Sequence, residues 1–320
     1  MHVVGIDAGG TKTVAALATP DGQIVAQARR GGANLRTHGE LAVEVVLHEV
    51  MEAVGAFDDG APLAVCVGMA GVDRRDEAST VRGILRRLGC RQRVIVVNDA
   101  LVALVAGADQ AFGVCVVAGT GSIVYGVDAT GHAARAGGWG PVLADEGSGF
   151  FVGRQALAAV MRAADGRGPR TALVPAVLKH YGVATPDALV QAIYGATDQR
   201  RQVASLGPVV EAARADGDRV AEELLAHAAD ELARAAQSVA VQLSMRGDVF
   251  PFVLAGGMFA ASPWMALTLT ARLGEVAPRA TVIPVPVEPV RGAVAVARDA
   301  GRGLFVAPVY RTPHVDLGAK

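Results

Sequence analysis

Two glycine-rich turns, each directly after an apolar run, carry residue types that bind phosphate. Residues 5–13 read Gly-Ile-Asp-Ala-Gly-Gly-Thr-Lys-Thr, and residues 117–122 read Val-Ala-Gly-Thr-Gly-Ser. Because glycine lacks a Cβ, backbone N–H groups in such turns can approach an oxyanion closely, and the Asp7 carboxylate could bind Mg²⁺ beside it. Neither turn forms a Walker A loop or a dinucleotide fingerprint, since Thr11 and Val124 stand where Lys and Gly are required. Two such turns suit a nucleoside triphosphate, although the first could also be an ordinary hairpin with a surface Asp.

Three further segments place polar groups at the ends of apolar runs. Residues 254–258, Leu-Ala-Gly-Gly-Met, could let an adenine or ribose lie flat on backbone, although alone they indicate only a turn. Asp99 stands between a strand and a helix, where it could be a general base or a helix N-cap. Residues 137–149 hold a Trp and two acidic residues among glycines, which is typical either of a sugar-binding loop or of a rigid loop with helix caps.

Hydrolase and metal-centre patterns are absent from the sequence. Ser148 does not form a nucleophile elbow, because Glu146 occupies the glycine position two residues before it. The seven histidines are dispersed, which disfavours a zinc site. Cys66, Cys90 and Cys115 lie far apart without CxxC spacing, so we expect buried thiols in a reducing compartment.

Composition bounds the class of protein. The 320 residues predict about two domains, and an apolar fraction of 52% excludes a disordered chain. With 30 basic and 31 acidic residues, the chain lacks the charge expected of a nucleic-acid-binding or membrane-surface protein. It has neither a signal-peptide pattern nor an apolar run long enough to span a membrane, so we expect a cytoplasmic protein.

The elements that must position these residues follow from periodicity. A β-meander precedes βα units, and a strand, glycine turn and strand recur roughly 110 residues later, which indicates an internal duplication. Strands are predicted at 2–7, 14–17, 24–28, 63–69, 94–97, 113–118, 123–127, 252–255 and 281–284. Helices are predicted at 41–54, 79–88, from 100 onward, at 219–245 and at 292–300. The expected units are 1–106, 107–300 with a helical insertion, and a tail at 301–320, with the last helix packing back on the first unit.

In order and spacing, these sites resemble the sugar-kinase, Hsp70 and actin superfamily. The Gly-Trp-Gly and Asp-Glu-Gly-Ser run within residues 138–148, following the second turn, resembles the BadF/BadG/BcrA/BcrD ATPase family and, within it, the N-acetylglucosamine kinases. The likeness covers residues 1 to about 300. It implies an α/β fold of two duplicated actin-like ATPase domains, ribonuclease H-like, with a nucleotide and sugar cleft between them.

The resemblance also implies roles for single residues. Asp99 would be the catalytic base that takes the proton from the sugar 6-hydroxyl as that oxygen attacks the γ-phosphate of ATP, and Asp7 would hold Mg²⁺. The implied ATP-binding residues are Gly9, Gly10, Thr11, Lys12, Gly119, Thr120, Gly121, Gly256 and Gly257. The implied sugar-binding residues are Asn34, Asp99, Gly121, Ser122, Gly138, Trp139, Gly140 and Asp145.

The implied activity is ATP-dependent phosphorylation of the 6-hydroxyl of N-acetylglucosamine or a related amino sugar or hexose. The alternative is an ATPase activator or regulatory scaffold of the same family that binds ATP without phosphorylating a sugar. Activators of this family hold an iron–sulfur cluster on clustered cysteines, which this sequence does not provide. Arg36, next to the sugar-binding Asn34, leaves open an anionic sugar such as N-acetylmuramate. We expect a homodimer without nucleic-acid or membrane partners.

Overall fold

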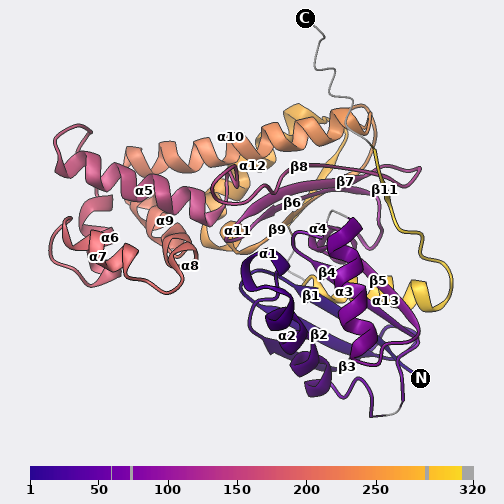
Figure 1. Cartoon of the computed structure of the whole chain (residues 1–320). Helices are drawn as coiled ribbons and strands as arrows, with labels where there is room; N and C mark the ends of the chain where they lie inside the picture. The colour runs from indigo at the N-terminus through magenta and orange to yellow at the C-terminus, as the bar shows by residue number, and fades with distance from the viewer. Residues whose placement is uncertain (59, 73–74, 285–287, 312–320) are drawn as a thin grey trace, which may run out of the picture.

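The computed structural model describes residues 1–58, 60–72, 75–284 and 288–311, and it contains two β-sheets with helices on their faces (Figure 1). The first sheet has the strand order β3-β2-β1-β4-β5. β2 is antiparallel to β1 and β3, whereas β1, β4 and β5 are parallel, so their carboxyl ends lie at one edge of the sheet. The strands are β1 Val3–Ala8, β2 Thr13–Ala18, β3 Ile24–Arg30, β4 Ala64–Met69 and β5 Arg93–Asn98.

Helices cover both faces of the first sheet, which explains why β1 and β4 are unbroken apolar runs. One face packs against α2 and α3 through a cluster that includes Leu47, Met51 and Ile84. The other face packs against α4 and α13, and the side chains of residues 100–105 in α4 are all buried. These helices are α1 Leu35–His38, α2 Glu40–Ala53, α3 Arg75–Arg87, α4 Asp99–Ala108 and α13 Val290–Gly301.

The second sheet repeats the first. Its order is β10-β9-β6-β7-β8-β11, in which β7 is antiparallel to β6 and β8, while β6, β9 and β10 are parallel. The glycine turns occupy equivalent places, since Ala8 pairs with Thr13 around the first and Ala118 with Ser122 around the second. The internal duplication is therefore confirmed. The strands are β6 Gly113–Ala118, β7 Ser122–Val127, β8 His132–Gly137, β9 Pro251–Ala255, β10 Thr281–Pro284 and β11 Val309–Tyr310.

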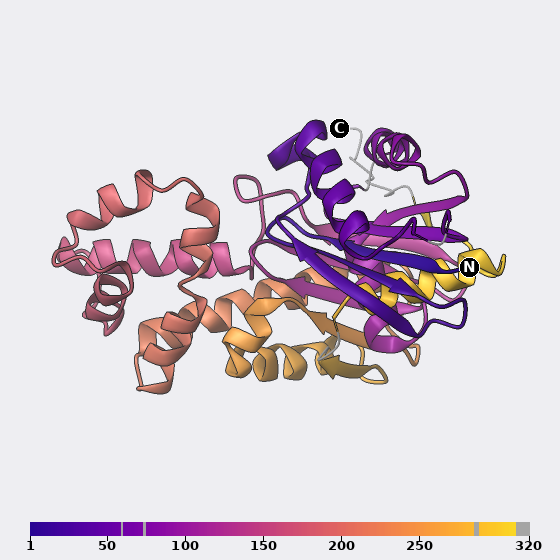
Figure 2. The same cartoon turned by 90° about the horizontal axis from the view of Figure 1, so that it is seen from below.

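A helical insertion separates β8 from β9. Figures 1 and 2 show α5–α9 extending from the second sheet, away from the first. Within the described residues, no helix is both long enough and apolar enough to cross a membrane. The helices are α5 Gly149–Ala164, α6 Leu173–Tyr181, α7 Ala188–Tyr194, α8 Gln199–Ala204, α9 Gly207–Ala215 and α10 Arg219–Gln242, followed after β9 by α11 Gly257–Ala261 and α12 Pro263–Val276.

Two glycines let backbones touch where α13 packs on the first sheet and on α4. A Cβ on Gly5 of β1 would overlap the backbone nitrogen of Val294 in α13. A Cβ on Gly292 of α13 would overlap the backbone oxygen of Val102 in α4. The core cluster around these helices also contains Cys115 of the second sheet, and α4 contacts β6, β7 and β9, so α4 packs between the two sheets, with α13 beside it on the first sheet. Asp99 begins α4, which places it at the junction of the halves.

The structure differs from the sequence-based expectations in a few elements. The helix predicted at 219–245 ends at Gln242, because Ser244 adopts a left-handed conformation with φ of 59°. Strand β8 and helix α12 were not predicted. Part of the expected tail forms β11 beside β8, and the ring of Tyr310 lies 6.0 Å from that of Tyr125. The rest of that tail, residues 312–320, lies outside the described residues, and the expected unit boundaries stay a prediction.

Candidate functional site

The first glycine turn closes on itself and packs against the segment that follows β3. The N–H of Gly9 donates to the carbonyl of Lys12 at 2.9 Å, and the N–H of Ala33 donates to the carbonyl of Gly9 at 3.0 Å. A Cβ on Gly32 would overlap the carbonyl of Gly10, so only glycine allows this approach. Gly10, Thr11 and Lys12 are exposed. Gly32 and Ala33 therefore support one side of the turn, and its exposed side, at Gly10, Thr11 and Lys12, is open to a ligand.

Asp7 lies buried at the end of β1, directly before this turn. Burial raises the pKa of Asp7 to about 6; the Lys12 charge lowers that pKa and the Glu288 charge raises it. Glu288, which precedes α13, is held by Arg29 at 2.9 Å and by Gln27. Glu288 was not predicted, because it is distant in sequence and belongs to no local motif. Its place before the last helix brings the second half of the chain to Asp7.

The buried carboxylate of Asp7, with Glu288 nearby, fits an Mg²⁺ ion that is bound mainly through a nucleotide. Among the described residues, no group of three or more His, Cys, Asp or Glu side chains could hold a metal ion by itself. Mg²⁺ is usually held by one or two protein carboxylates together with substrate phosphates and water. A single buried carboxylate beside a glycine turn matches that pattern, and the destabilised charge of Asp7 would be offset by a cation.

The second glycine turn is held by α5 and by the glycine pair Gly256 and Gly257, called the late glycine pair below. The N–H of Gly149, the first residue of α5, donates to the carbonyl of Gly119 at 2.8 Å. Gly256 has φ of 106°, and a Cβ there would overlap the carbonyl of Ala118. Gly257 starts α11, and nothing lies within 4 Å of where its Cβ would be. One glycine of this pair therefore supports the second turn, and the other faces open space.

Asp99 is the first residue of α4, and the capping role belongs to its neighbour. The side-chain oxygen of Asn98, the N-cap residue, accepts the N–H of Ala100 at 2.8 Å, and Oδ1 of Asp99 accepts the same N–H at 3.0 Å. Burial raises the pKa of the Cys115 thiol, and the nearby charge of Asp99 raises it further. Asp99 therefore stands at the end of β5 and close to β6 of the other sheet.

Two of the predicted sugar-binding residues follow equivalent strands of the two halves, Asn34 after β3 and Trp139 after β8. The side-chain nitrogen of Asn34 donates to the carbonyl of Ala70, just beyond β4, at 3.2 Å. Trp139 is half exposed, and the guanidinium carbon of Arg135 lies 4.3 Å from its ring centroid. Gly138 has φ of 71°, and a Cβ there would overlap the side chain of Ile123, so the loop requires glycine at this position. Both side chains are positioned by the ends of strands.

Asp145 connects three parts of the site. It is a buried residue with φ of 67°, and its Oδ2 accepts a hydrogen bond from Nη2 of Arg200 at 2.7 Å. Burial raises the pKa of Asp145, and the Arg200 charge with hydrogen bonds from the backbones of Ser122 and Gly140 offsets part of that rise. The Ser122 hydroxyl donates to the carbonyl of Glu146 at 2.6 Å. Arg200 was not predicted, since it lies in the helical insertion outside any motif.

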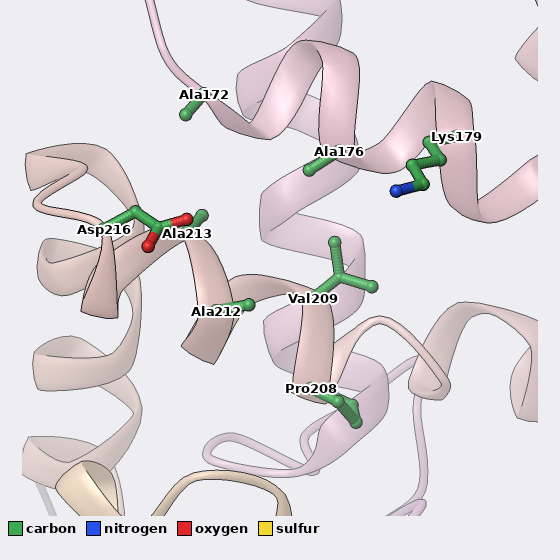
Figure 3. A pocket seen from close by; sticks show the side chains of 8 residues that line it. All are labelled: Ala172, Ala176, Lys179, Pro208, Val209, Ala212, Ala213 and Asp216. Carbon is green, nitrogen blue, oxygen red and sulfur yellow. The ribbon is translucent and has the colours of Figure 1, made fainter.

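The predicted residues thus gather at the carboxyl ends of parallel strands, which is where α/β sheets bind ligands. The first sheet contributes Asp7, the first turn, Asn34 and Asp99; the second contributes the second turn, the Trp139 loop, Asp145 and the glycine pair. A cavity of about 310 Å³ lies elsewhere, between α6 and α9 (Figure 3). Its lining is Ala172, Ala176, Lys179, Pro208, Val209, Ala212, Ala213 and Asp216. It contains none of the predicted site residues.

This duplicated fold, with a glycine turn after the first strand of each half, defines the class: it is the two-domain fold of the sugar-kinase, Hsp70 and actin superfamily. The chain belongs to the BadF/BadG/BcrA/BcrD ATPase family, whose model matches residues 4–297. The fold class and family predicted from sequence are therefore confirmed.

Relatives and a solved structure match nearly the whole chain. An N-acetylmuramic acid/N-acetylglucosamine kinase of Clostridium acetobutylicum is 34% identical, with 93% of this chain and 98% of the relative covered. An N-acetyl-D-glucosamine kinase of Dictyostelium discoideum is 32% identical, with 92% and 97% covered. A structure from Chromobacterium violaceum, provisionally named an N-acetylglucosamine kinase, has a TM-score of 0.71 at 28% identity, with 92% and 97% covered.

Proposed function

We propose that this protein is an ATP-dependent sugar kinase that transfers the γ-phosphoryl group to the 6-hydroxyl of N-acetylglucosamine or a related amino sugar. The observation that carries the proposal is the position of Asp99, at the start of the helix that packs between two sheets with equivalent glycine turns. The names of relatives at 34% and 32% identity support the same activity. Sugar kinases need backbone groups that cradle phosphate and one positioned carboxylate; the two glycine turns and Asp99 are the candidates for these roles.

In this proposal, the two turns bind the nucleotide phosphates and the late glycine pair binds the adenosine. Backbone N–H groups of the turns at 9–12 and 119–121 donate to phosphate oxygens, aided by the hydroxyls of Thr11 and Thr120. Asp7 would hold Mg²⁺ through water, with Glu288 nearby. When bound with ATP, Mg²⁺ supplies positive charge that offsets the negative charge developing on the transferred phosphoryl group.

Asp99 acts as the general base in this proposal. Its carboxylate accepts the proton of the sugar 6-hydroxyl while that oxygen bonds to the γ-phosphorus and the bond from that phosphorus to ADP breaks. Asn34, Trp139 and Asp145 orient the sugar, which keeps the 6-hydroxyl in line with the γ-phosphate. The proton remains on Asp99 until product release returns it to solvent.

A coupled ADP-release assay tests the proposed function. Wild-type protein with Mg-ATP is assayed with N-acetylglucosamine, glucosamine, glucose, N-acetylmannosamine and N-acetylmuramate, and the phosphorylated position is identified by ³¹P NMR. We expect sugar-dependent ADP release with phosphate on the 6-oxygen and the highest kcat/KM for an N-acetylated amino sugar. ATP binding without stimulation by any of these sugars would contradict the proposal and favour a family activator or scaffold.

A further inference from the structure

An arginine from the helical insertion lies directly on the second glycine turn. Nη2 of Arg200, in α8, is 2.7 Å from Oδ2 of Asp145, and a Cβ on Gly121 would overlap that same nitrogen. The Nε atom of Arg200 is buried and has no acceptor within the described part of the chain. A buried donor without a partner is costly, so a native site is expected to pair it with an acceptor from outside the chain, such as water or a ligand atom.

The position of Arg200 is fixed by close helix packing. A Cβ on Gly153 of α5 would overlap the carbonyl of Val203 in α8, so these two backbones are in contact. The first residue of α5, Gly149, donates its N–H to the second turn at Gly119. Arg200 is thus carried on an element that packs against the helix holding the phosphate turn, and it needs no loop movement to reach the site.

The negative charge of Asp145 beside Arg200 limits which ligand groups could accept from the Nε–H of Arg200. Asp145 is buried and already accepts hydrogen bonds from Arg200 and from the backbones of Ser122 and Gly140. A carboxylate offers about four lone-pair positions, so one remains for a further donor. A phosphate or carboxylate oxygen would accept from Arg200 but would be repelled by Asp145, whereas a hydroxyl can accept from Arg200 and donate to Asp145.

We propose that Arg200 is a sugar-binding and specificity-determining residue, whose Nε–H donates to a ring hydroxyl of the substrate that itself donates to Asp145. This inference rests on the proposed function, since it requires a sugar at the second turn. It assigns the helical insertion a direct part in substrate choice: a sugar lacking that hydroxyl leaves both a buried donor and a buried acceptor unpaired.

The test compares Arg200→Ala with Arg201→Ala, whose exposed side chain lies next along α8. Both variants and wild type are assayed with N-acetylglucosamine and with analogues deoxygenated at position 3 or position 4, and thermal melting checks that each is folded. We expect Arg200→Ala to lower kcat/KM for the sugar roughly 10- to 100-fold through KM, with the KM for ATP unchanged. The penalty for deoxygenation at one of the two positions should shrink at least about fivefold in Arg200→Ala and stay unchanged in Arg201→Ala.

Four results would overturn the proposal. If wild type phosphorylates the sugar and Arg200→Ala matches it within about twofold, Arg200 does not bind substrate, although the proposed function stands. If both deoxygenation penalties persist in Arg200→Ala, or if the KM for ATP rises in place of that for sugar, the donor does not contact a ring hydroxyl. If wild type phosphorylates no sugar, the proposed function fails and this inference fails with it.

Discussion

Replacing each glycine of the late pair with alanine separates structural support from nucleotide binding. Gly256 has φ of 106° and ψ of 157°, a region that is essentially restricted to glycine and costs another residue about 1–3 kcal/mol. Its Cβ would also overlap the Ala118 carbonyl and lie 2.9 Å from the nitrogen of Gly119. Such overpacking costs about 1–3 kcal/mol more, because a strand carbonyl cannot move aside freely.

Gly256→Ala should therefore lower the free energy of unfolding by about 2–6 kcal/mol, a large part of the roughly 5–15 kcal/mol typical of a folded protein. Gly257→Ala is the matched control, because its Cβ would meet nothing within 4 Å and it stands at the start of a helix. We expect its unfolding free energy to stay within about 1 kcal/mol of wild type. If adenosine lies on this glycine, its KM for ATP should nevertheless rise.

Urea denaturation followed by circular dichroism measures the first effect, and steady-state kinetics at varied ATP measures the second. A Gly256→Ala variant as stable as wild type would refute the argument from backbone contact. A Gly257→Ala variant with normal stability and a normal KM for ATP would refute the placement of the nucleotide at this pair.

Two further predictions concern stability and substrate choice. Asp218 caps α10 and accepts hydrogen bonds from the N–H of Ala221 at 2.9 Å and the hydroxyl of Thr171 at 2.8 Å. Asp218→Ala should therefore lower the free energy of unfolding, measured by urea titration at pH 7, by about 1–2 kcal/mol. Burial alone would raise the pKa of Asp218, but its hydrogen bonds lower that pKa overall. The ionised cap therefore stabilises the fold above a pH of about 4. The difference in unfolding free energy between wild type and Asp218→Ala should shrink as the pH falls toward about 3. A difference independent of pH would show that the charge does not matter. The side chain of Arg36 lies outside the described residues, and our hypothesis that it binds an anionic sugar predicts lower kcat/KM for N-acetylmuramate in Arg36→Ala; equal turnover would count against it.

Much of the fold follows from local sequence patterns. The glycine turns and the apolar strands beside them repeat because each half needs a hairpin and a parallel strand in the same order, and that repeat is visible in residues 5–13 and 117–122. Strand β8 was missed because its sequence, His-Ala-Ala-Arg-Ala-Gly, has no β-branched residue. Strand β11 has only two residues, which is too short for any alternation to be recognised.

The candidate site was only partly predictable, for a physical reason. Residues such as Asp99 and Asn34 stand beside strand ends, where a short motif marks them. Arg200 and Glu288 reach the site through packing between distant elements, and neither has a local pattern that distinguishes it from other surface charges. Asp99 also resembles a helix cap locally, and the structure gives that role to Asn98. The predicted homodimer stays a prediction, which light scattering would test.

The most direct test of the central claim is the rate of sugar-dependent ADP release in Asp99→Asn. Asp109→Asn is the matched control, because Asp109 terminates the same helix at its other end, in a left-handed conformation that Asn also tolerates. If Asp99 is the general base, its variant should fold normally and bind ATP, but lose roughly 10²- to 10⁴-fold in kcat, while the control retains wild-type activity. An Asp99→Asn variant that phosphorylates the sugar at the wild-type rate would contradict the proposed mechanism.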